Sequence, residues 1–257
     1  MNASPPRIRA VPAVTRAVAI LRLLGSSREP LALKEIASTL GIVPSTALHI
    51  LRALVAEDLL QVDAATKRYR LGVGMLPLAR AVLEHGDFPS LVRPWLRELS
   101  ERYSVAAIGV EVPNLRHMIV VALARSQAPV RLHVDVGSRF PALISATGRC
   151  VAAFTDRPWP EIEAGFRTLK WHDAPDLETW KAEVETVRRQ GYSIDRGHYI
   201  AGVTIVAVPV CKASGTITHT IVAVGLGGQI DEAKALAIAA DMQRAAREIE
   251  GQILPQA

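Results

Sequence analysis

The sequence predicts an α+β chain of two domains: a small helical domain with a β-hairpin, followed by a larger domain built on an antiparallel sheet. Two observations support this division. Apolar residues recur at helical spacing through the first third of the chain, whereas the remainder alternates strand-like and helical segments joined by short turns. The 257 residues suffice for two hydrophobic cores, since 49% of them are hydrophobic.

Positive charge is concentrated in the first domain. Residues 1–80 contain eleven Lys or Arg and five Asp or Glu, a net charge of +6; the remaining residues contain nineteen and twenty, a net charge of −1. This asymmetry favours a polyanionic partner, although a solvated basic face has the same composition. The sequence contains no apolar run of the length of a membrane span or a signal peptide. We therefore expect a cytoplasmic protein whose two cysteines, Cys150 and Cys211, are buried and reduced.

The first domain is expected over residues 13–72, after a flexible arm at residues 1–12. Apolar residues at i, i+3 and i+4 spacing predict three helices, at Val14–Leu24, at 33–40 before Gly41, and from Ser45, which can cap the third. A β-hairpin follows, with arms at 59–62 and 67–71 around a polar turn. Two short helices around a glycine-containing turn, followed by a hairpin, are typical of a winged helix-turn-helix fold.

The second domain is expected over residues 89–257, joined to the first by a linker helix at 73–88. We expect Gly86–Pro89 to interrupt the chain and Ser90 to cap the next helix. Further strands are predicted at 105–112, 117–124, 130–134, 203–210 and 216–224, and further helices at 147–154, 177–190 and 231–253. Neighbouring strands joined by short turns imply a largely antiparallel sheet with helices packed on it.

The chain resembles the IclR family of bacterial transcriptional regulators. The matching segments are LKEIASTLG (33–41), VPSTALHILRALVAEDLLQ (43–61), KRYRLG (67–72), VGSRFPALISATGRCVAAF (136–154) and GYSIDRGHYIAGVTIVAVPV (191–210). The resemblance implies an N-terminal winged helix-turn-helix domain that binds a palindromic double-stranded DNA operator. It also implies a C-terminal GAF-like effector-binding domain, and homodimers or dimers of dimers.

The resemblance further implies that the third helix reads the DNA. We expect four side chains to face the major groove, and three on the hairpin to contact the phosphate backbone: Ser45, Thr46, His49 and Arg52, then Lys67, Arg68 and Arg70. His49 stands where the family usually carries an arginine. An exposed histidine that touches only solvent or phosphate is the alternative, and the operator sequence stays open.

A carboxylate site is predicted where Ser145–Gly148 leads into a helix, because free N–H groups and the helix dipole favour an anion there. An ordinary helix cap without a ligand is the alternative. The resemblance implies effector contacts from seven residues: Ala146, Thr147, Gly148, Asp195, Ile205, Gly225 and Gly227.

Three of these seven residues differ from the family pattern. Ile205 replaces a cysteine of the family, and Gly225 and Gly227 replace two serines, so polar contacts suited to very small keto acids are lost. We therefore expect an organic acid larger and more apolar than pyruvate, such as an aromatic or branched acid. Backbone packing in a strand or bulge is the alternative role of the two glycines.

Enzyme motifs are not evident in the sequence. The seven histidines form no HxxxH pair, no serine lies in a GxSxG motif, and Gly225–Gly228 lacks the spacing of a phosphate loop. We therefore expect no enzyme activity, no metal and no cofactor. Cys150 follows Arg149 near a helix start, where a thiol can be redox-active or simply buried. The alternative function is a small-molecule-binding or enzymatic domain whose N-terminal part serves only dimerisation.

Overall fold

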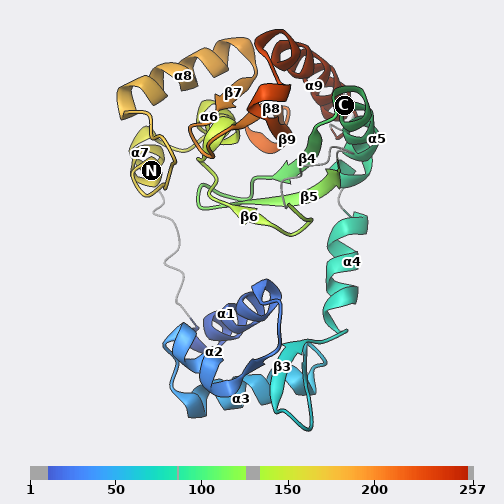
Figure 1. Ribbon diagram of the computed structural model, residues 1–257, viewed down its shortest axis with the longest axis vertical. Helices are drawn as coiled ribbons and strands as arrows, with labels where there is room; N and C mark the ends of the chain where they lie inside the picture. Colours follow the sequence, from blue (N-terminus) through green and yellow to red (C-terminus); the bar gives the residue numbers. More distant parts are fainter. Residues whose placement is uncertain (1–10, 86, 126–133, 254–257) are drawn as a thin grey trace, which may run out of the picture. The chain divides into compact units, whose positions relative to one another are not determined.

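The computed structural model of this chain describes residues 11–85, 87–125 and 134–253. Contacts within the chain divide it into a smaller unit that ends at His85 and a larger unit that begins after it (Figure 1). The arm expected at residues 1–12 and the strand expected at 130–134 fall almost entirely outside the described residues.

The smaller unit contains four helices and a three-stranded sheet among its described residues. The helices are α1 (Pro12–Ser26), α2 (Leu33–Leu40), α3 (Pro44–Ala56) and α4 (Met75–His85), and the strands are β1 (Leu31–Ala32), β2 (Leu60–Val62) and β3 (Arg68–Leu71). The strands pair antiparallel in the order β1-β3-β2. Side chains from the first three helices and the hairpin form one core around Ile20, Ile36 and Leu51. The predicted winged helix-turn-helix fold is confirmed.

The starts and ends of these helices follow from local backbone chemistry. Gly41 ends α2 in the left-handed conformation, with a φ of 62°, which costs a glycine nothing. The expectation that Ser45 caps α3 was wrong. Pro44 occupies the first helical position, where its missing N–H is not needed, and Val43 precedes it as the cap residue.

The larger unit contains a six-stranded antiparallel sheet in the order β6-β5-β4-β9-β8-β7. The strands are β4 (Ala106–Glu111), β5 (Met118–Ala124), β6 (Arg139–Phe140), β7 (Ser193–Arg196), β8 (Val203–Cys211) and β9 (Ile217–Leu226). The helices are α5 (Asp87–Tyr103), α6 (Ser145–Phe154), α7 (Trp159–Phe166), α8 (Leu177–Gln190) and α9 (Glu232–Ile253), with a 3-10 turn, η1, at Gly227–Gln229.

Helices cover both faces of this sheet (Figure 1). On one face α5 and α9 pack through a core that includes Leu96 and Met242, and on the other α6, α7 and α8 pack through a core that includes Trp180. Side chains of β8 alternate between the two cores: Val206 joins the first core and Ile205 the second. The predicted antiparallel sheet with packed helices is confirmed.

The start of α5 differs from the prediction. Residues 87–89 form the first turn of the helix, with Phe88 and Pro89 buried, so neither the expected interruption through Pro89 nor a cap at Ser90 is present. Proline fits a first helical turn, because the N–H it lacks has no acceptor there. Among the described helices, none alone is long and apolar enough to cross a membrane; α2 and α3 reach that length and composition only as a pair, bent by 115°.

Candidate functional site

The exposed face of α3 presents the side chains expected to read DNA. Ala47, Leu51 and Leu54 are buried in the core of the smaller unit, which turns the opposite stripe outward. Ser45, His49 and Arg52 lie on this outer stripe at i, i+4 and i+7, and Thr46 beside them is half-buried. The helix therefore brings all four predicted residues together on or beside one surface.

The hairpin positions its three cations differently from one another. Arg68 Nη1 donates to the backbone oxygen of Pro30 at 2.9 Å and lies 3.1 Å from Glu35 Oε2, while Arg70 Nη2 donates to Gln61 Oε1 at 2.9 Å. In the described part of the chain the Lys67 ammonium has no such partner. Lys67 has a φ of 55° at the end of the turn and precedes β3. Lys67 is therefore the cation that the turn presents, and the two arginines are held by their own domain.

The turn itself is fixed by one carboxylate. Asp63 Oδ1 accepts hydrogen bonds from the backbone N–H groups of Ala65 and Thr66 and from the Thr66 hydroxyl. These bonds, those from Thr66 above all, hold the pKa of Asp63 below its usual value, so the carboxylate stays ionised. These three hydrogen bonds define the conformation of the turn at the tip of the hairpin.

The second candidate site is a partly open cavity of about 150 Å3 in the larger unit, between α6 and the sheet. Its walls are mostly aliphatic and come from five strands, the residues around the start of α6, Val134 and the segment after β7. The lining side chains are Ile108, Val110, Met118, Val120, Val134, Phe140, Ile144, Ser145, Thr147, Tyr199, Ile200, Ile205, Val222 and Val224. Burial raises the pKa of Tyr199, so its phenol is neutral at physiological pH.

Polar groups meet this cavity at the beginning of α6. Ile144 occupies the cap position and provides no side-chain hydrogen bond, so the first-turn N–H groups of α6 lack a capping acceptor. Ser145 has a φ of 61°, and among the described residues its buried Oγ has no hydrogen-bond partner. The combination of an uncapped helix start and an unpaired buried hydroxyl is suited to a ligand with oxygen acceptors.

The structure brings only part of the predicted effector set to this cavity. Thr147 and Ile205 line it. Asp195 is buried, but its carboxylate faces Arg149 rather than the cavity, with Oδ2 3.5 Å from Nη1. Ala146 and Gly148 lie in α6 outside the lining, and a Cβ at Gly148 would come within 1.9 Å of the carbonyl carbon of Leu143.

Gly225 in β9 and Gly227 in η1 also lie outside the lining. A Cβ at Gly225 would meet Ile230 Cδ1 at 2.8 Å, on the face of the sheet that packs against α9. A Cβ at Gly227 would lie 3.3 Å from the backbone oxygen of Gly202. Both contacts fit the packing alternative, so the volume of the cavity does not arise from these glycines.

Sequence reasoning missed most of the residues that form the cavity. The alternating pairs Ile108 and Val110, Met118 and Val120, and Val222 and Val224 each point to one face of their strand. That alternation was visible in the sequence, but which face contains the cavity was not. Tyr199 and Ile200 lie in the matching segment 191–210 but were not predicted to contact the effector, because residues without regular structure have no periodicity that indicates a face.

Comparisons with known proteins cover both domains. The IclR helix-turn-helix domain model matches residues 13–64, and the model of the bacterial transcriptional regulator IclR C-terminal domain matches residues 80–251. The glycerol operon regulatory protein of Streptomyces griseus is 30% identical over 203 residues, which are 79% of this chain and 80% of that protein.

Solved structures give the same result. An IclR transcriptional regulator from Alicyclobacillus acidocaldarius superposes with a TM-score of 0.84 at 25% identity, over 95% of this chain and 99% of that one. An IclR homologue from Microbacterium hydrocarbonoxydans, solved with 4-hydroxybenzoate, superposes with a TM-score of 0.77 at 19% identity, over 94% and 98%. With a helix-turn-helix domain and a C-terminal effector-binding domain, this chain belongs to the IclR family of bacterial transcriptional regulators.

Proposed function

We propose that a small, largely apolar carboxylate controls the affinity of this regulator for its operator. The cavity carries the proposal, because it joins a chamber of about 150 Å3 with aliphatic walls to the uncapped start of α6. An engineered cavity of roughly this volume with similar walls binds benzene. The ring or branched chain of the effector would fill the chamber, and its carboxylate would accept hydrogen bonds from Ser145 Oγ and the first-turn amides of α6.

Very small keto acids suit these walls poorly. Each oxygen of pyruvate or glyoxylate that faced an aliphatic side chain would lose its hydrogen bonds to water, at a cost of about 1–3 kcal/mol. A ring of the size of benzoate instead removes apolar surface from water, which contributes about 25 cal/mol per Å2. The 4-hydroxybenzoate in the Microbacterium homologue belongs to the same chemical class and supports this choice.

Calorimetry on the full-length protein tests the effector class. The panel comprises benzoate, 4-hydroxybenzoate, the branched acid isovalerate, pyruvate and glyoxylate. We expect at least one of the first three to bind and neither keto acid to bind measurably. Tight binding of pyruvate without a response to the larger acids would refute the proposed class.

We also propose that a cytoplasmic homodimer binds a palindromic duplex. Besides Val43 at the start of α3, five large apolar side chains of the smaller unit are each more than half exposed, and a second copy of the chain would cover these five: Val11, Val14, Val73, Leu76 and Leu78. A symmetric dimer sets two α3 helices one or more DNA turns apart. Effector binding would shift α4, which follows the hairpin in sequence, and thereby change that separation. Linkage requires DNA to alter effector affinity by the same factor.

A mobility-shift assay on the duplex upstream of the protein's own gene tests the DNA part. We expect retention that survives excess competitor DNA and changes when a binding acid is added. Arg52→Ala should abolish this specific retention, whereas Arg22→Ala, which removes an exposed cation from α1, should preserve it. If no duplex is preferred, or if both variants behave alike, the first domain serves another role such as dimerisation alone.

A further inference from the structure

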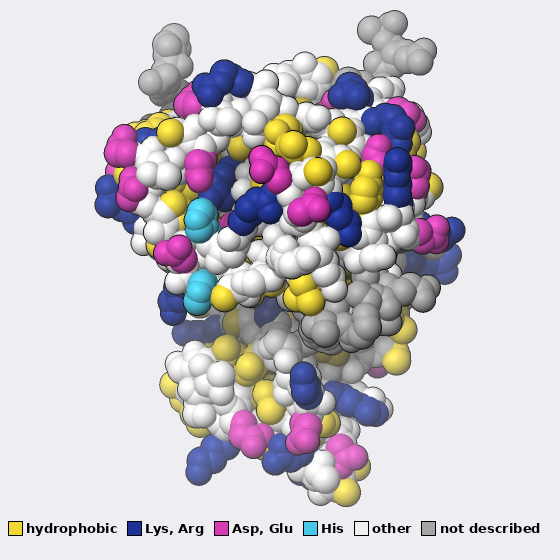
Figure 2. Space-filling view, turned by 45° about the horizontal axis from the view of Figure 1, so that its top comes forward, with side chains coloured by type: hydrophobic (Ala, Val, Ile, Leu, Met, Phe, Trp, Pro, Cys, Tyr) yellow, Lys and Arg dark blue, Asp and Glu magenta, His cyan; other side chains and the backbone are white. Residues whose placement is uncertain are grey.

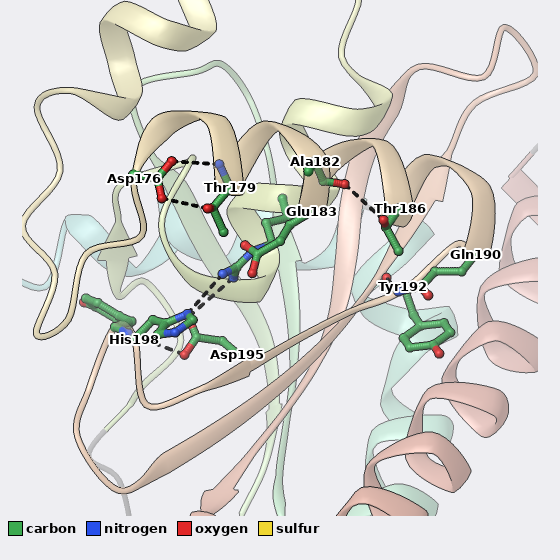
Figure 3. Close-up of polar contacts among 11 residues, drawn as sticks. Asp176, Thr179, Ala182, Glu183, Thr186, Gln190, Tyr192, Asp195 and His198 are labelled. Atoms are coloured by element: carbon green, nitrogen blue, oxygen red, sulfur yellow. Dashed lines mark hydrogen bonds and ion pairs between the residues drawn. The ribbon is translucent and has the colours of Figure 1, made fainter.

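A fully buried arginine lies in the middle of α6, outside the lining of the cavity. Arg149 is 2% exposed, and three groups from α8, β7 and the segment after β7 surround its guanidinium. Nε donates to Glu183 Oε2 at 2.6 Å, Nη1 lies 3.5 Å from Asp195 Oδ2, and Nη2 lies 3.3 Å from His198 Nδ1. Figure 3 shows Glu183, Asp195 and His198 converging on this point from their separate elements. A guanidinium keeps its charge when buried, so these partners determine where it can lie.

Two of these partners also hold the segment that follows β7. Asp195 Oδ1 accepts a hydrogen bond from the backbone N–H of Tyr199 at 3.4 Å. The backbone oxygen of His198 accepts from the N–H groups of His172 and Asp173 at 3.0 and 2.9 Å. A guanidinium has only donors, so His198 Nδ1 is the acceptor in its contact with Arg149. Arg149 is thus joined to this segment through two of its three partners.

The same segment forms one wall of the cavity. Residues 198–201, here called the flap, contribute Tyr199 and Ile200 to the lining. Gly197 and Gly202 flank the flap with φ values of 93° and 70°, a conformation that glycine adopts without strain. The flap has no regular secondary structure, and side-chain contacts therefore have a large share in fixing its position.

We infer that Arg149 is a positioning residue that holds the flap closed over the cavity and thereby sets the rate at which the effector leaves. Ser145, at the cavity, and Arg149, at the flap anchor, lie one turn apart on the same helix. A rigid α6 therefore fixes the distance between the ligand-binding end and the flap. The part that concerns the effector rests on the proposed function, whereas the order of the flap does not.

Hydrogen–deuterium exchange of the full-length protein without ligand tests the flap. In Arg149→Met the N–H groups of residues 172, 173 and 199 should exchange about tenfold faster, because the contacts that hold their acceptors are lost. Exchange in β8 and β9 should not change. Arg188→Met is the matched control, since Arg188 Nε donates to the backbone oxygen of Ala153 at the other end of α6 and does not contact the flap.

A second variant covers the case in which Arg149→Met does not fold. His198→Ala removes one partner of the guanidinium and leaves Glu183 and Asp195 to neutralise it, so the core stays intact. The N–H of Tyr199 should again exchange faster than in the wild-type protein. Exchange at wild-type rates in the folded variants, or an equal increase in Arg188→Met, would overturn the inference.

The dissociation rate of benzoate, followed by stopped-flow tryptophan fluorescence, tests the consequence for the effector. His198→Ala and Arg149→Lys should release benzoate about tenfold faster, with a smaller change in the association rate. Unchanged release from variants with a loosened flap would overturn the link to the effector. If the wild-type protein does not bind benzoate, the effector class is at fault, and the exchange experiment still decides the role of Arg149.

Discussion

Replacing Ser145 by glycine should make the unliganded protein more stable and its effector binding weaker. A φ of 61° costs an L-residue about 1–2 kcal/mol, and glycine does not bear this cost. Leaving a buried hydroxyl without a partner costs about 1–3 kcal/mol, and the substitution removes that hydroxyl. Both effects stabilise the folded variant. The greater conformational entropy of glycine in the unfolded chain opposes them and costs about 0.5–1 kcal/mol. The free energy of unfolding should therefore rise by about 1–4 kcal/mol.

Thermal unfolding and calorimetry measure the two effects on the same samples. A gain of 1 kcal/mol raises the Tm of a domain of this size by about 2–4 °C. The affinity for benzoate should fall about tenfold, because one hydrogen bond to a charged group is lost. Ser104→Gly is the matched control: Ser104 has a φ of 53° but is exposed and does not line the cavity. This control should raise the Tm slightly and leave binding unchanged.

Either of two results would refute this reasoning. A lower Tm in Ser145→Gly would mean that the hydroxyl stabilises the unliganded fold, and the polar end of the cavity would need another explanation. Unchanged affinity for an acid that binds the wild-type protein would mean that the carboxylate does not meet α6 at Ser145. The Ser104→Gly control separates these outcomes from a general effect of glycine.

Three further predictions concern pH, thiol reactivity and the hairpin. Burial lowers the pKa of His219, stacked on Phe88, to about 4. Since the unfolded imidazole titrates near 6.5, stability should fall by about 2–3 kcal/mol from pH 7 to pH 4, and denaturant titrations of His219→Phe should show a smaller fall. Burial raises the pKa of the Cys150 thiol, and that of Cys211 to about 11, so an aromatic disulfide reagent at pH 7.5 should label neither before unfolding; rapid labelling of the native protein would contradict this. Lys67→Ala should lower the log–log salt slope of DNA binding by about one for every sequence, and an unchanged slope would exclude a phosphate contact.

Elements with strong local signals were predictable from the sequence. The helix expected at 177–190 has those bounds, because Asp176 Oδ1 accepts from the N–H of Thr179 at its start and Gly191, with a φ of 75°, ends it. These interactions lie within a few residues of each other, so the sequence contains them directly. The helix-turn-helix and the hairpin were predictable for the same reason.

Short elements held by distant partners were not predictable. β1 has two residues and exists because it pairs with β3, and β7 has four residues that pair with β8. No element was predicted at α7, where Pro158 precedes the helix and Pro160 lies in the first turn, which tolerates proline. Segments this short gain their order from tertiary contacts, which a local pattern does not contain.

The candidate cavity was predictable at its helical end and at Ile205 of β8. Helix-start chemistry pointed to Ser145–Gly148, and two residues of that segment line the cavity. Gly225 was aligned with a pocket residue of the family, but its missing side chain would point toward Ile230 on the opposite face. A shift of one residue in the register of a strand moves each side chain to the other face of the sheet. A sequence match alone therefore does not decide which face a residue occupies.

Charge is distributed differently at the surface and in the interior of the larger unit. Lys and Arg side chains are interspersed with Asp and Glu over the face shown in Figure 2. This agrees with the composition of residues 81–257, which contain nineteen Lys or Arg and twenty Asp or Glu. Ion pairs exposed in this way contribute about 0–1 kcal/mol each. In the cluster around Arg149 the guanidinium and the Asp195 carboxylate are buried, whereas the Glu183 side chain is 34% exposed. For the buried pair, the cost of removing charges from water can exceed their mutual attraction.

That cost argues for a role of the Arg149 cluster beyond stability. Well-packed apolar residues in place of a buried ion cluster are often neutral or stabilising by about 1–4 kcal/mol, so stability alone does not account for the cluster. What apolar residues would not provide is direction. His198 Nδ1 accepts from Nη2 of Arg149, and the Asp195 carboxylate forms an ion pair with Nη1 at 3.5 Å without a hydrogen bond, so these two contacts restrict where the flap can lie. A ligand that enters the cavity would then have to displace the flap or fit beneath it. Aliphatic contacts in place of the charged ones would not fix the flap in one position.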